Sequence, residues 1–276
     1  MLKNASALAR SSHPGPSVAV SAIAVILGFG VGLEPWRLVI LGFAFLANQV
    51  SVGLSNDWID ADRDRAVGRT DKPLALGQIP DSVVRNGAFV AAAVSIALTI
   101  PLGWPATIAQ SAFIVSAWAY NAGLKNTAFS VLPYIVSFGV LPLVVTLSLP
   151  SPAFASPWAL LAGALLGVAA HFSNVLPDLE DDRATGISGL PHRVGTRASG
   201  VLIALALAGA AMSIVLGLGP APAYLYVGLA LSLLLAIGCA LLVITGRSSR
   251  LIFRLIILGA LIDVVLLALS GARIIA

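Results

Sequence analysis

The chain has 276 residues, of which 58% are hydrophobic and only 10% are charged, and its formal net charge is +4. Soluble domains carry about 25% charged residues, so this composition excludes an ordinary soluble enzyme and predicts an integral membrane protein. Its positive charges sit where a membrane protein places them, and we expect no nucleic-acid partner. The single cysteine, Cys239, excludes an intramolecular disulfide and a cysteine-based metal cluster.

Apolar stretches of about 20 residues can cross a bilayer as helices. Such stretches follow one another at 17–33, 37–57, 82–102, 105–122, 128–149, 157–177, 198–218, 222–245 and 251–272. Turn-forming sequences such as LGWPA and GLGPAPA separate them. Because open sheet edges do not occur in lipid, we expect one all-α domain, residues 1–276, built as a bundle of nine transmembrane helices.

The positive charges predict the orientation of this bundle. With the N-terminus in the cytoplasm, 14 of the 16 lysines and arginines fall on or near the cytoplasmic side. Only Arg37 and Arg273 fall outside. Since cytoplasmic loops carry an excess of Lys and Arg, we expect a multi-pass protein of the lipid bilayer with its N-terminus in the cytoplasm.

The acidic residues gather in two related segments. Ten of the 12 Asp and Glu residues lie in 57–81 and 178–182, which follow the second and the sixth apolar stretch and therefore share the cytoplasmic side. NDWIDADRDRAVGRTDKPLALG at 56–77 and NVLPDLEDDRATGISGLPHRVG at 174–195 are identical at eight of 22 positions, with an offset of 118. The offset spans four helices, so it predicts an internal parallel repeat of four-helix units with a functional site between the halves.

The spacing within each segment has a geometric meaning. Residues four positions apart lie on one face of a helix. Each segment therefore presents a polar stripe, formed by Asn56, Asp60 and Asp64 and by Asn174, Asp178 and Asp182. Facing carboxylates repel one another unless cations bind, and an oxygen-only ligand set favours Mg²⁺ with substrate phosphates. Basic residues that could hold those phosphates are Arg65, Arg69, Lys72, Lys125 and Arg193.

At these residues the sequence resembles the UbiA superfamily of intramembrane prenyltransferases, from about residue 15 to the end. The first family signature, N-D-x-x-D-x-x-x-D followed by R-T-x-R-P, is matched by Asn56, Asp57, Asp60 and Asp64 and then by Arg69, Thr70 and Pro73. The second, D-x-x-x-D, is matched by Asp178 and Asp182. Lys72 departs from the pattern, since the family usually has arginine there, so a forked phosphate contact becomes a point charge.

The resemblance implies a Mg²⁺-dependent prenyltransferase that moves a polyprenyl group from its diphosphate to an aromatic or other lipophilic acceptor. Under it, Asp60, Asp64, Asp178 and Asp182 are catalytic, and together with Asn56, Asp57 and Asn174 they bind the metal. An alternative of the same family is an intramembrane terpene cyclase that uses a prenyl diphosphate without a separate acceptor. A transporter is a third hypothesis, but transporters bind near the bilayer midplane, whereas these acids gather at one end.

Three further residues are candidates for contacting the acceptor or acting as a base. They are Asp181, His171 and Tyr120. His171 precedes Asn174 by three residues and can share its helix face. Solvation of Asp181, a buried structural histidine, and interfacial anchoring of Tyr120 are the alternatives. The sequence gives no partner for Asp263 in the last apolar stretch, and its role stays open.

Overall fold

The computed structural model describes residues 2–176, 179, 188–220, 222–245 and 249–276, and this part of the chain is almost entirely helical. The helices are α1 (Leu2–Ser11), α2 (Pro14–Gly30), α3 (Pro35–Ile59), α4 (Ala61–Ala66), α5 (Asp81–Thr99), α6 (Trp104–Ala122), α7 (Leu132–Leu147), α8 (Pro157–Val175), α10 (Leu190–Leu218), α11 (Ala223–Ile244) and α12 (Ser249–Leu269). Three short 3-10 turns accompany them, of which Leu124–Asn126 matters for the site. Among the described residues the only β-type pairing is the isolated bridge between Ala155 and Ile275.

The predicted all-α membrane architecture is confirmed, whereas the predicted number of nine transmembrane helices is not. Each of the nine apolar stretches overlaps a helix of the structure. Among the described residues, five helices are long and apolar enough to cross a membrane by length and composition, and three apolar helices are shorter. The protein is therefore a multi-pass membrane protein, while the number nine and the internal repeat stay predictions. The short helices α1 and α4 lie outside the predicted stretches.

Proline marks where many of these helices begin. Pro14, Pro35, Pro105, Pro133, Pro157 and Pro191 each occupy the first or second position of a helix. The missing N–H costs nothing there, because the first turn has no intrahelical acceptor, and the fixed φ suits the helix. In α10, Gly195 has φ 81° and interrupts the helix, so the predicted start at 198 corresponds to the part after this kink.

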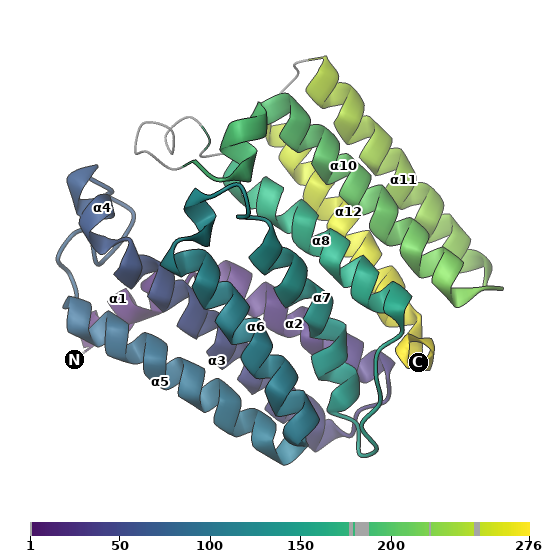
Figure 1. Cartoon of the computed structure of the whole chain (residues 1–276), viewed down its shortest axis with the longest axis horizontal. Helices are drawn as coiled ribbons and strands as arrows, with labels where there is room; N and C mark the ends of the chain where they lie inside the picture. The colour runs from purple at the N-terminus through teal and green to yellow at the C-terminus, as the bar shows by residue number, and fades with distance from the viewer. Residues whose placement is uncertain (1, 177–178, 180–187, 221, 246–248) are drawn as a thin grey trace.

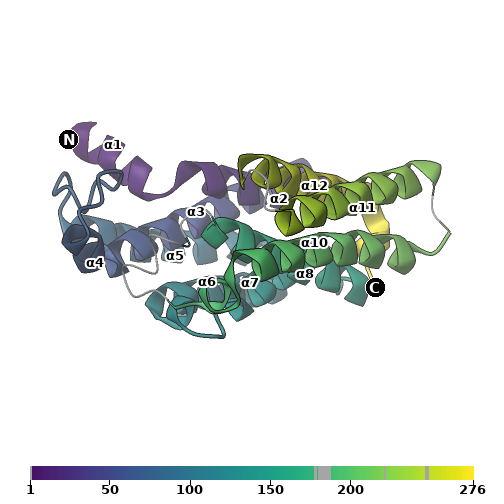
Figure 2. The same cartoon turned by 90° about the horizontal axis from the view of Figure 1, so that it is seen from above.

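Among the residues that the structure describes, the contacts between the long helices close a ring of seven, and α5 and α11 lie outside it at opposite edges of the molecule (Figure 1). Neighbouring contacts run from α2 to α3, α6, α7, α8, α10 and α12, and α12 returns to α2. Helix α5 packs on α3 and α6, and α11 packs on α10 and α12. Seen from above, α2 and α12 lie over one face of the molecule and α6, α7 and α8 over the other (Figure 2). The interior enclosed by this ring is where a substrate cavity can form.

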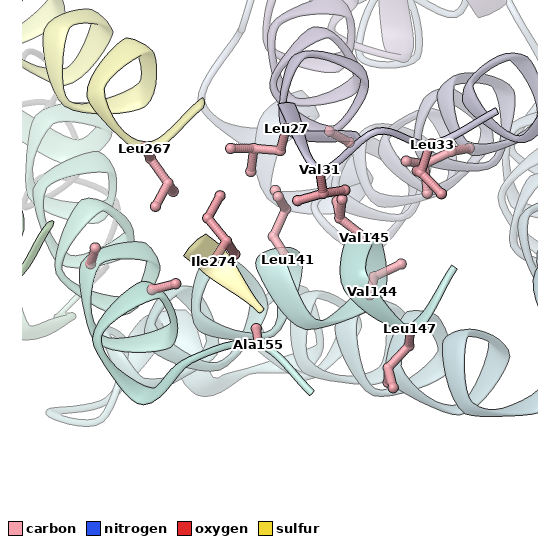
Figure 3. Close-up of a cluster of buried hydrophobic side chains, with 14 of the residues drawn as sticks. Leu27, Val31, Leu33, Leu141, Val144, Val145, Leu147, Ala155, Leu267 and Ile274 are labelled. Atoms are coloured by element: carbon pink, nitrogen blue, oxygen red, sulfur yellow. The ribbon is translucent and has the colours of Figure 1, made fainter. Parts of the chain in front are cut away.

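One end of the ring is closed by apolar packing. Leu27 of α2, Leu141 of α7 and Leu267 of α12 converge there with Ile274 of the C-terminal turn (Figure 3). Glycines let the helix backbones approach closely, since a Cβ on Gly163 would lie 2.4 Å from the carbonyl oxygen of Phe138. Small residues at helix contacts are expected where lipid removes the hydrophobic driving force. Access to the interior is therefore expected at the opposite end, where α3 and α6 finish.

Candidate active site

A cavity of about 550 Å³ opens inside the ring. Its walls are the inner faces of α2, α3, α6, α7 and α8, together with the segments that follow α3 and α6 and the first turn of α10 with the residue before it. On α6 the lining residues are spaced three or four apart, from Phe113 to Tyr120. Because both α3 and α6 end at the acidic motif, the cavity is polar at that end and becomes apolar toward the middle of the helices.

Asp60 stands at the polar end, paired with two cations of the chain. Lys125 Nζ lies 2.5 and 2.6 Å from the two carboxylate oxygens of Asp60, and Arg63 Nη2 lies 3.0 Å from Oδ2. Asp60 and Lys125 are only 6% and 8% exposed. Lys125 belongs to the turn after α6, so this pair ties the ends of α3 and α6 together at the cavity mouth. All three side chains line the cavity.

Asp57 and Asp64 are buried beneath this pair and share Lys72. Lys72 Nζ lies 3.1 Å from Asp57 Oδ1 and 2.8 Å from Asp64 Oδ2. His13 Nε2 lies 3.1 Å from the same Asp57 Oδ1. The two carboxylates are 1% and 2% exposed and do not line the cavity, whereas Lys72 and His13 do. The acid motif is thus layered, with Asp60 at the cavity wall and Asp57 and Asp64 behind the lysine.

A break in the helix creates this layering. Helix α3 ends at Ile59, and Asp60 lies at the junction with the separate helix α4, which carries Asp64. The backbone hydrogen bonds from Asp60 to Asn56 and from Asp64 to Asp60 still run four residues apart. The predicted stripe of Asn56, Asp60 and Asp64 is therefore kept in register, although it does not lie on one continuous helix. Gly68, with φ 68°, then turns the chain away in a conformation that glycine adopts without strain.

Amide groups extend the polar wall from α3 to α6. Asn56 Nδ2 donates to Asn121 Oδ1 at 3.2 Å, and Asn121 Nδ2 donates to Ser55 Oγ at 2.8 Å. Both asparagines line the cavity, and Asn121 is only 2% exposed. The bond to Asn121 orients the Asn56 amide through Nδ2 and does not use its side-chain oxygen Oδ1.

The segment before α7 and helix α8 meet at the cavity through Ser130 and His171. The Leu190 N–H donates to Ser130 Oγ at 2.8 Å, and His171 Nε2 lies 3.0 Å from the same oxygen. Close approach of the backbone at Gly189 fixes this junction, because a Cβ there would lie 2.5 Å from the carbonyl oxygen of Lys125. The segment before α10 is thus held directly against the turn that carries Lys125.

Aromatic rings form another part of the cavity wall. The ring centroid of Tyr134 lies 5.2 Å from that of Tyr120 and 4.9 Å from that of His171, and Tyr134 stacks on Phe138 at 6.2 Å. Asn174 Nδ2 donates to the Tyr134 hydroxyl at 3.5 Å. All five side chains line the cavity. Such a wall accommodates an apolar chain and presents π-electron density to a positive charge.

Charge and burial shift the pKa values of Lys72, Lys125 and Asp71. Burial alone would lower the pKa of Lys72, but Asp57 and Asp64 outweigh it, and the pKa lies above its usual value. Burial lowers the pKa of Lys125, and the Asp60 carboxylate opposes this only in part. The Arg69 guanidinium lowers the pKa of the Asp71 carboxyl to about 2. Lys72 therefore stays an ammonium at any physiological pH.

The structure brings together many of the residues that the sequence singled out and leaves others apart. Cavity-lining members of that set are Asn56, Asp60, Arg69, Lys72, Tyr120, Lys125, His171 and Asn174. Arg65 is not at the cavity, since it pairs with Asp62 and Asp81 on the surface of α4. Arg193 is also absent from the lining, and its Nε donates to the Ser188 carbonyl oxygen.

The predictions for Asp178, Asp181 and Asp182 lie outside the described residues. Within the described part of the chain, no group of three or more His, Cys, Asp and Glu side chains is arranged to hold a metal ion. Sequence reasoning missed His13, Arg63 and Tyr134 as parts of the cavity wall. Only Arg63 carried a signal, because it lies one residue before Asp64 in the motif.

Comparison with known proteins agrees with this architecture. The model of the UbiA prenyltransferase family matches residues 17–268. A digeranylgeranylglyceryl phosphate synthase of Korarchaeum cryptofilum is 28% identical over 154 residues, which cover 54% of this chain and 53% of that relative. The match thus spans about half of the relative's length.

Solved structures of similar fold share little sequence. A UbiA homologue from Archaeoglobus fulgidus, bound to GPP and Mg²⁺, superposes with a TM-score of 0.73 at 16% identity, covering 96% of this chain and 99% of its own. An apo UbiA homologue from Aeropyrum pernix K1 gives a TM-score of 0.69 at 19% identity, covering 90% and 94%. The family match over most of the chain, with the fold and the first acidic signature, shows that this protein belongs to the UbiA prenyltransferase family.

Proposed function

We propose that this protein is a Mg²⁺-dependent prenyltransferase that moves a polyprenyl group from its diphosphate to a lipophilic acceptor. The observation that carries the proposal is the cavity itself, which has the buried Asp60 with Lys72 and Lys125 at one end and aromatic walls beyond them. A prenyl diphosphate has the same division, with a charged head and an apolar tail. The relatives of similar fold that bind GPP and Mg²⁺ support this assignment of donor and metal.

The donor atoms of the first acidic motif suit a Mg²⁺ ion, although Arg63, Lys72 and Lys125 now hold the carboxylates and no three of them surround a metal site among the described residues. The candidate ligands are all oxygens, from Asn56, Asp57, Asp60 and Asp64, as Mg²⁺ prefers. Asp57 Oδ2 is buried and has no hydrogen-bond partner within the described residues, so it is an oxygen available to a cation. Asp178, Asp182 and Asn174 remain predicted ligands from the second signature. Bound there, the ion would neutralise charge on the departing diphosphate.

The basic residues of the chain are placed to receive that diphosphate. Lys72, Lys125 and Arg63 now neutralise the carboxylates, and they line the same cavity end as Arg69. When the head group enters, these cations can donate to its oxygens. The allylic C–O bond then breaks, its electron pair leaves with the diphosphate, and the allylic carbon is left positive. Preorganised donors of this kind stabilise the charge that develops on the leaving oxygens.

The aromatic wall is placed to stabilise the allylic cation until the acceptor captures it. Tyr120 and Tyr134 lie near one another and can stabilise the allylic cation by roughly 0.5–2 kcal/mol. The acceptor then forms the new bond to the allylic carbon and gives up a proton. We propose a lipophilic acceptor. The family resemblance implies an aromatic acceptor, and the similarity to a digeranylgeranylglyceryl phosphate synthase supports a glyceryl phosphate lipid as a second candidate.

Asp60→Ala tests this function against a matched control on the neighbouring helix. Asp60 is buried on Lys125, whereas the Asp62 side chain is fully exposed and, among the described residues, pairs with Arg65 alone. Purified protein with GPP or geranylgeranyl diphosphate, Mg²⁺ and an acceptor panel should release diphosphate and form a prenylated product. Asp60→Ala should lose about 100-fold or more of this activity, and Asp62→Ala should retain it.

Two outcomes would change the conclusion. Full activity of Asp60→Ala, or of the wild type in EDTA, would overturn the Mg²⁺-dependent mechanism. Diphosphate release without any acceptor, with a cyclised hydrocarbon or terpene alcohol as product, would identify the cyclase alternative instead.

A further inference from the structure

The N-terminal helix, which lies outside the stretch matched by the family model, is built into the active-site end of the protein. That stretch begins at residue 17, whereas α1 spans Leu2–Ser11. Ala7 of α1 is 1% exposed and packs in one cluster with Leu54 and Leu74. Arg10 Nη2 donates to Gln78 Oε1 at 2.7 Å. Helix α1 therefore holds both α3 and the loop that carries the basic part of the first acidic motif.

The turn after α1 is pressed tightly onto α3. A Cβ on Gly53 would lie 2.6 Å from the Ser12 carbonyl oxygen, so only glycine allows this approach. Ser17 Oγ donates to the same carbonyl at 2.8 Å. His13 follows with φ 50° and ψ 66°, and it is the one non-glycine residue of positive φ in the described chain. A side chain held in this conformation costs free energy, and such strain collects at functional sites.

The strained backbone delivers the His13 ring to the innermost acid. Its Nε2 lies 3.1 Å from Asp57 Oδ1, and Lys72 Nζ lies at the same distance from that oxygen. A carboxylate accepts hydrogen bonds only, so Nε2 is the donor. His13 and Lys72 both contact Asp57 at Oδ1, while the buried Oδ2 has no hydrogen-bond partner in the region that the structure covers. His13 also lines the cavity, which Asp57 does not reach.

We propose that His13 is a positioning residue of the active site, supplied by the N-terminal segment, which fixes the Asp57 carboxylate behind Lys72 so that Oδ2 can bind the cation that accompanies the diphosphate once Lys72 turns to the diphosphate oxygens. The inference rests on the function proposed above. Groups that orient a ligating carboxylate typically change metal affinity or activity by 10–100-fold when they are removed. A bond that merely fastened α1 to α3 would have no such effect on cation binding.

Three variants separate these roles. His13→Gly removes the ring and relieves the positive φ, so the fold should lose little stability. His13→Gln restores a neutral N–H donor of similar reach. Arg10→Ala loosens α1 at Gln78 and leaves His13 in place. Each detergent-purified full-length protein is titrated with Mg²⁺ in the presence of inorganic diphosphate, and the rise in unfolding temperature gives the apparent Mg²⁺ affinity.

We expect His13→Gly to need about 10-fold more Mg²⁺ than the wild type for the same rise in unfolding temperature. His13→Gln should restore most of the affinity, and Arg10→Ala should match the wild type. A His13→Gly protein with wild-type Mg²⁺ dependence overturns the inference, as do equal losses in His13→Gly and Arg10→Ala. A wild type that does not respond to Mg²⁺ and diphosphate overturns the proposed function and this inference together.

Discussion

At the scale of single residues, the acidic motif is neutralised by the chain itself. Asp60 is held by Lys125 and Arg63, and Lys72 bridges Asp57 and Asp64. Buried carboxylates left without partners would be costly, and breaking a buried pair by removing one partner typically costs 3–5 kcal/mol. The lysines therefore have two roles, since they stabilise the fold when no substrate is bound and become diphosphate ligands in the proposed reaction.

Replacement of Lys72 tests the structural role, and its pH dependence has a defined sign. Lys72→Met should lower the free energy of unfolding by roughly 3 kcal/mol at pH 7, because it leaves two buried carboxylates with fewer partners. The folded pKa of Lys72 is raised, so its contribution is fully present below the unfolded value near 10.5 and is lost as the pH rises through the higher folded value. The difference from wild type should thus be equal at pH 7 and pH 9 and should shrink only above 10.5.

This difference is measured as the free energy of unfolding of the detergent-solubilised wild type, Lys72→Met and Lys72→Arg at pH 7, 9 and 11. Lys72→Arg keeps the charge and should stay close to wild type. Asp71→Asn serves as a second control, because the Arg69–Asp71 pair is exposed and worth about 0–1 kcal/mol. Equal stability of Lys72→Met and wild type at pH 7 would contradict the role given to this ammonium.

The sequence singled out the acids of the first motif but not which residues they contact. Asp60 and Lys125 are 65 positions apart, and their contact depends on where α3 and α6 end relative to one another. His13 gave no signal, because its position depends on the fit of a turn against Gly53. Local spacing encodes a helix face, but the meeting of two helix ends is a property of the packed bundle.

At the scale of elements, the contact of α7 with α8 depends on glycine. A Cβ on Gly167 would lie 2.4 Å from the carbonyl oxygen of Tyr134, a backbone atom that cannot move without its helix. Gly167→Ala should therefore push α7 from α8 and destabilise the protein by roughly 1–3 kcal/mol. Gly139→Ala is the matched control at the same interface, because its Cβ would lie 3.4 Å from the Ala164 Cβ. Thermal unfolding in detergent compares the two, and equal melting temperatures would show that the interface yields without cost.

Helix positions were predictable because apolar length and proline placement are local properties. The internal repeat, in contrast to the helix positions, stays a prediction. Its offset of 118 does carry the bounds of α3, α5, α6 and α7 onto those of α8, α10, α11 and α12 within about ten residues. Helix α4 shows the limit of such reasoning, because the junction at Asp60 separates it from α3 although the polar spacing continues.

At the scale of the whole molecule, the ring has a closed apolar end and an end where the acids and lysines open into the cavity. This asymmetry agrees with the predicted charge bias, since most Lys and Arg residues fall on the side of the acidic motifs. A charged diphosphate would then enter from the aqueous cytoplasm while its tail stays in the apolar interior. The orientation in the membrane decides whether this route is correct.

Cysteine labelling tests that orientation directly. Thr70 lies in the acidic-motif loop and Ser151 lies between α7 and α8, and both are exposed. The native Cys239 is only 1% exposed, so the wild type should give little background. In intact cells a membrane-impermeant maleimide should label Ser151→Cys, because the positive-inside rule places that segment outside. Thr70→Cys should be labelled only after the membrane is permeabilised. The reverse pattern would invert the predicted topology, and labelling of both in intact cells would mean that the chain between them crosses the membrane an even number of times.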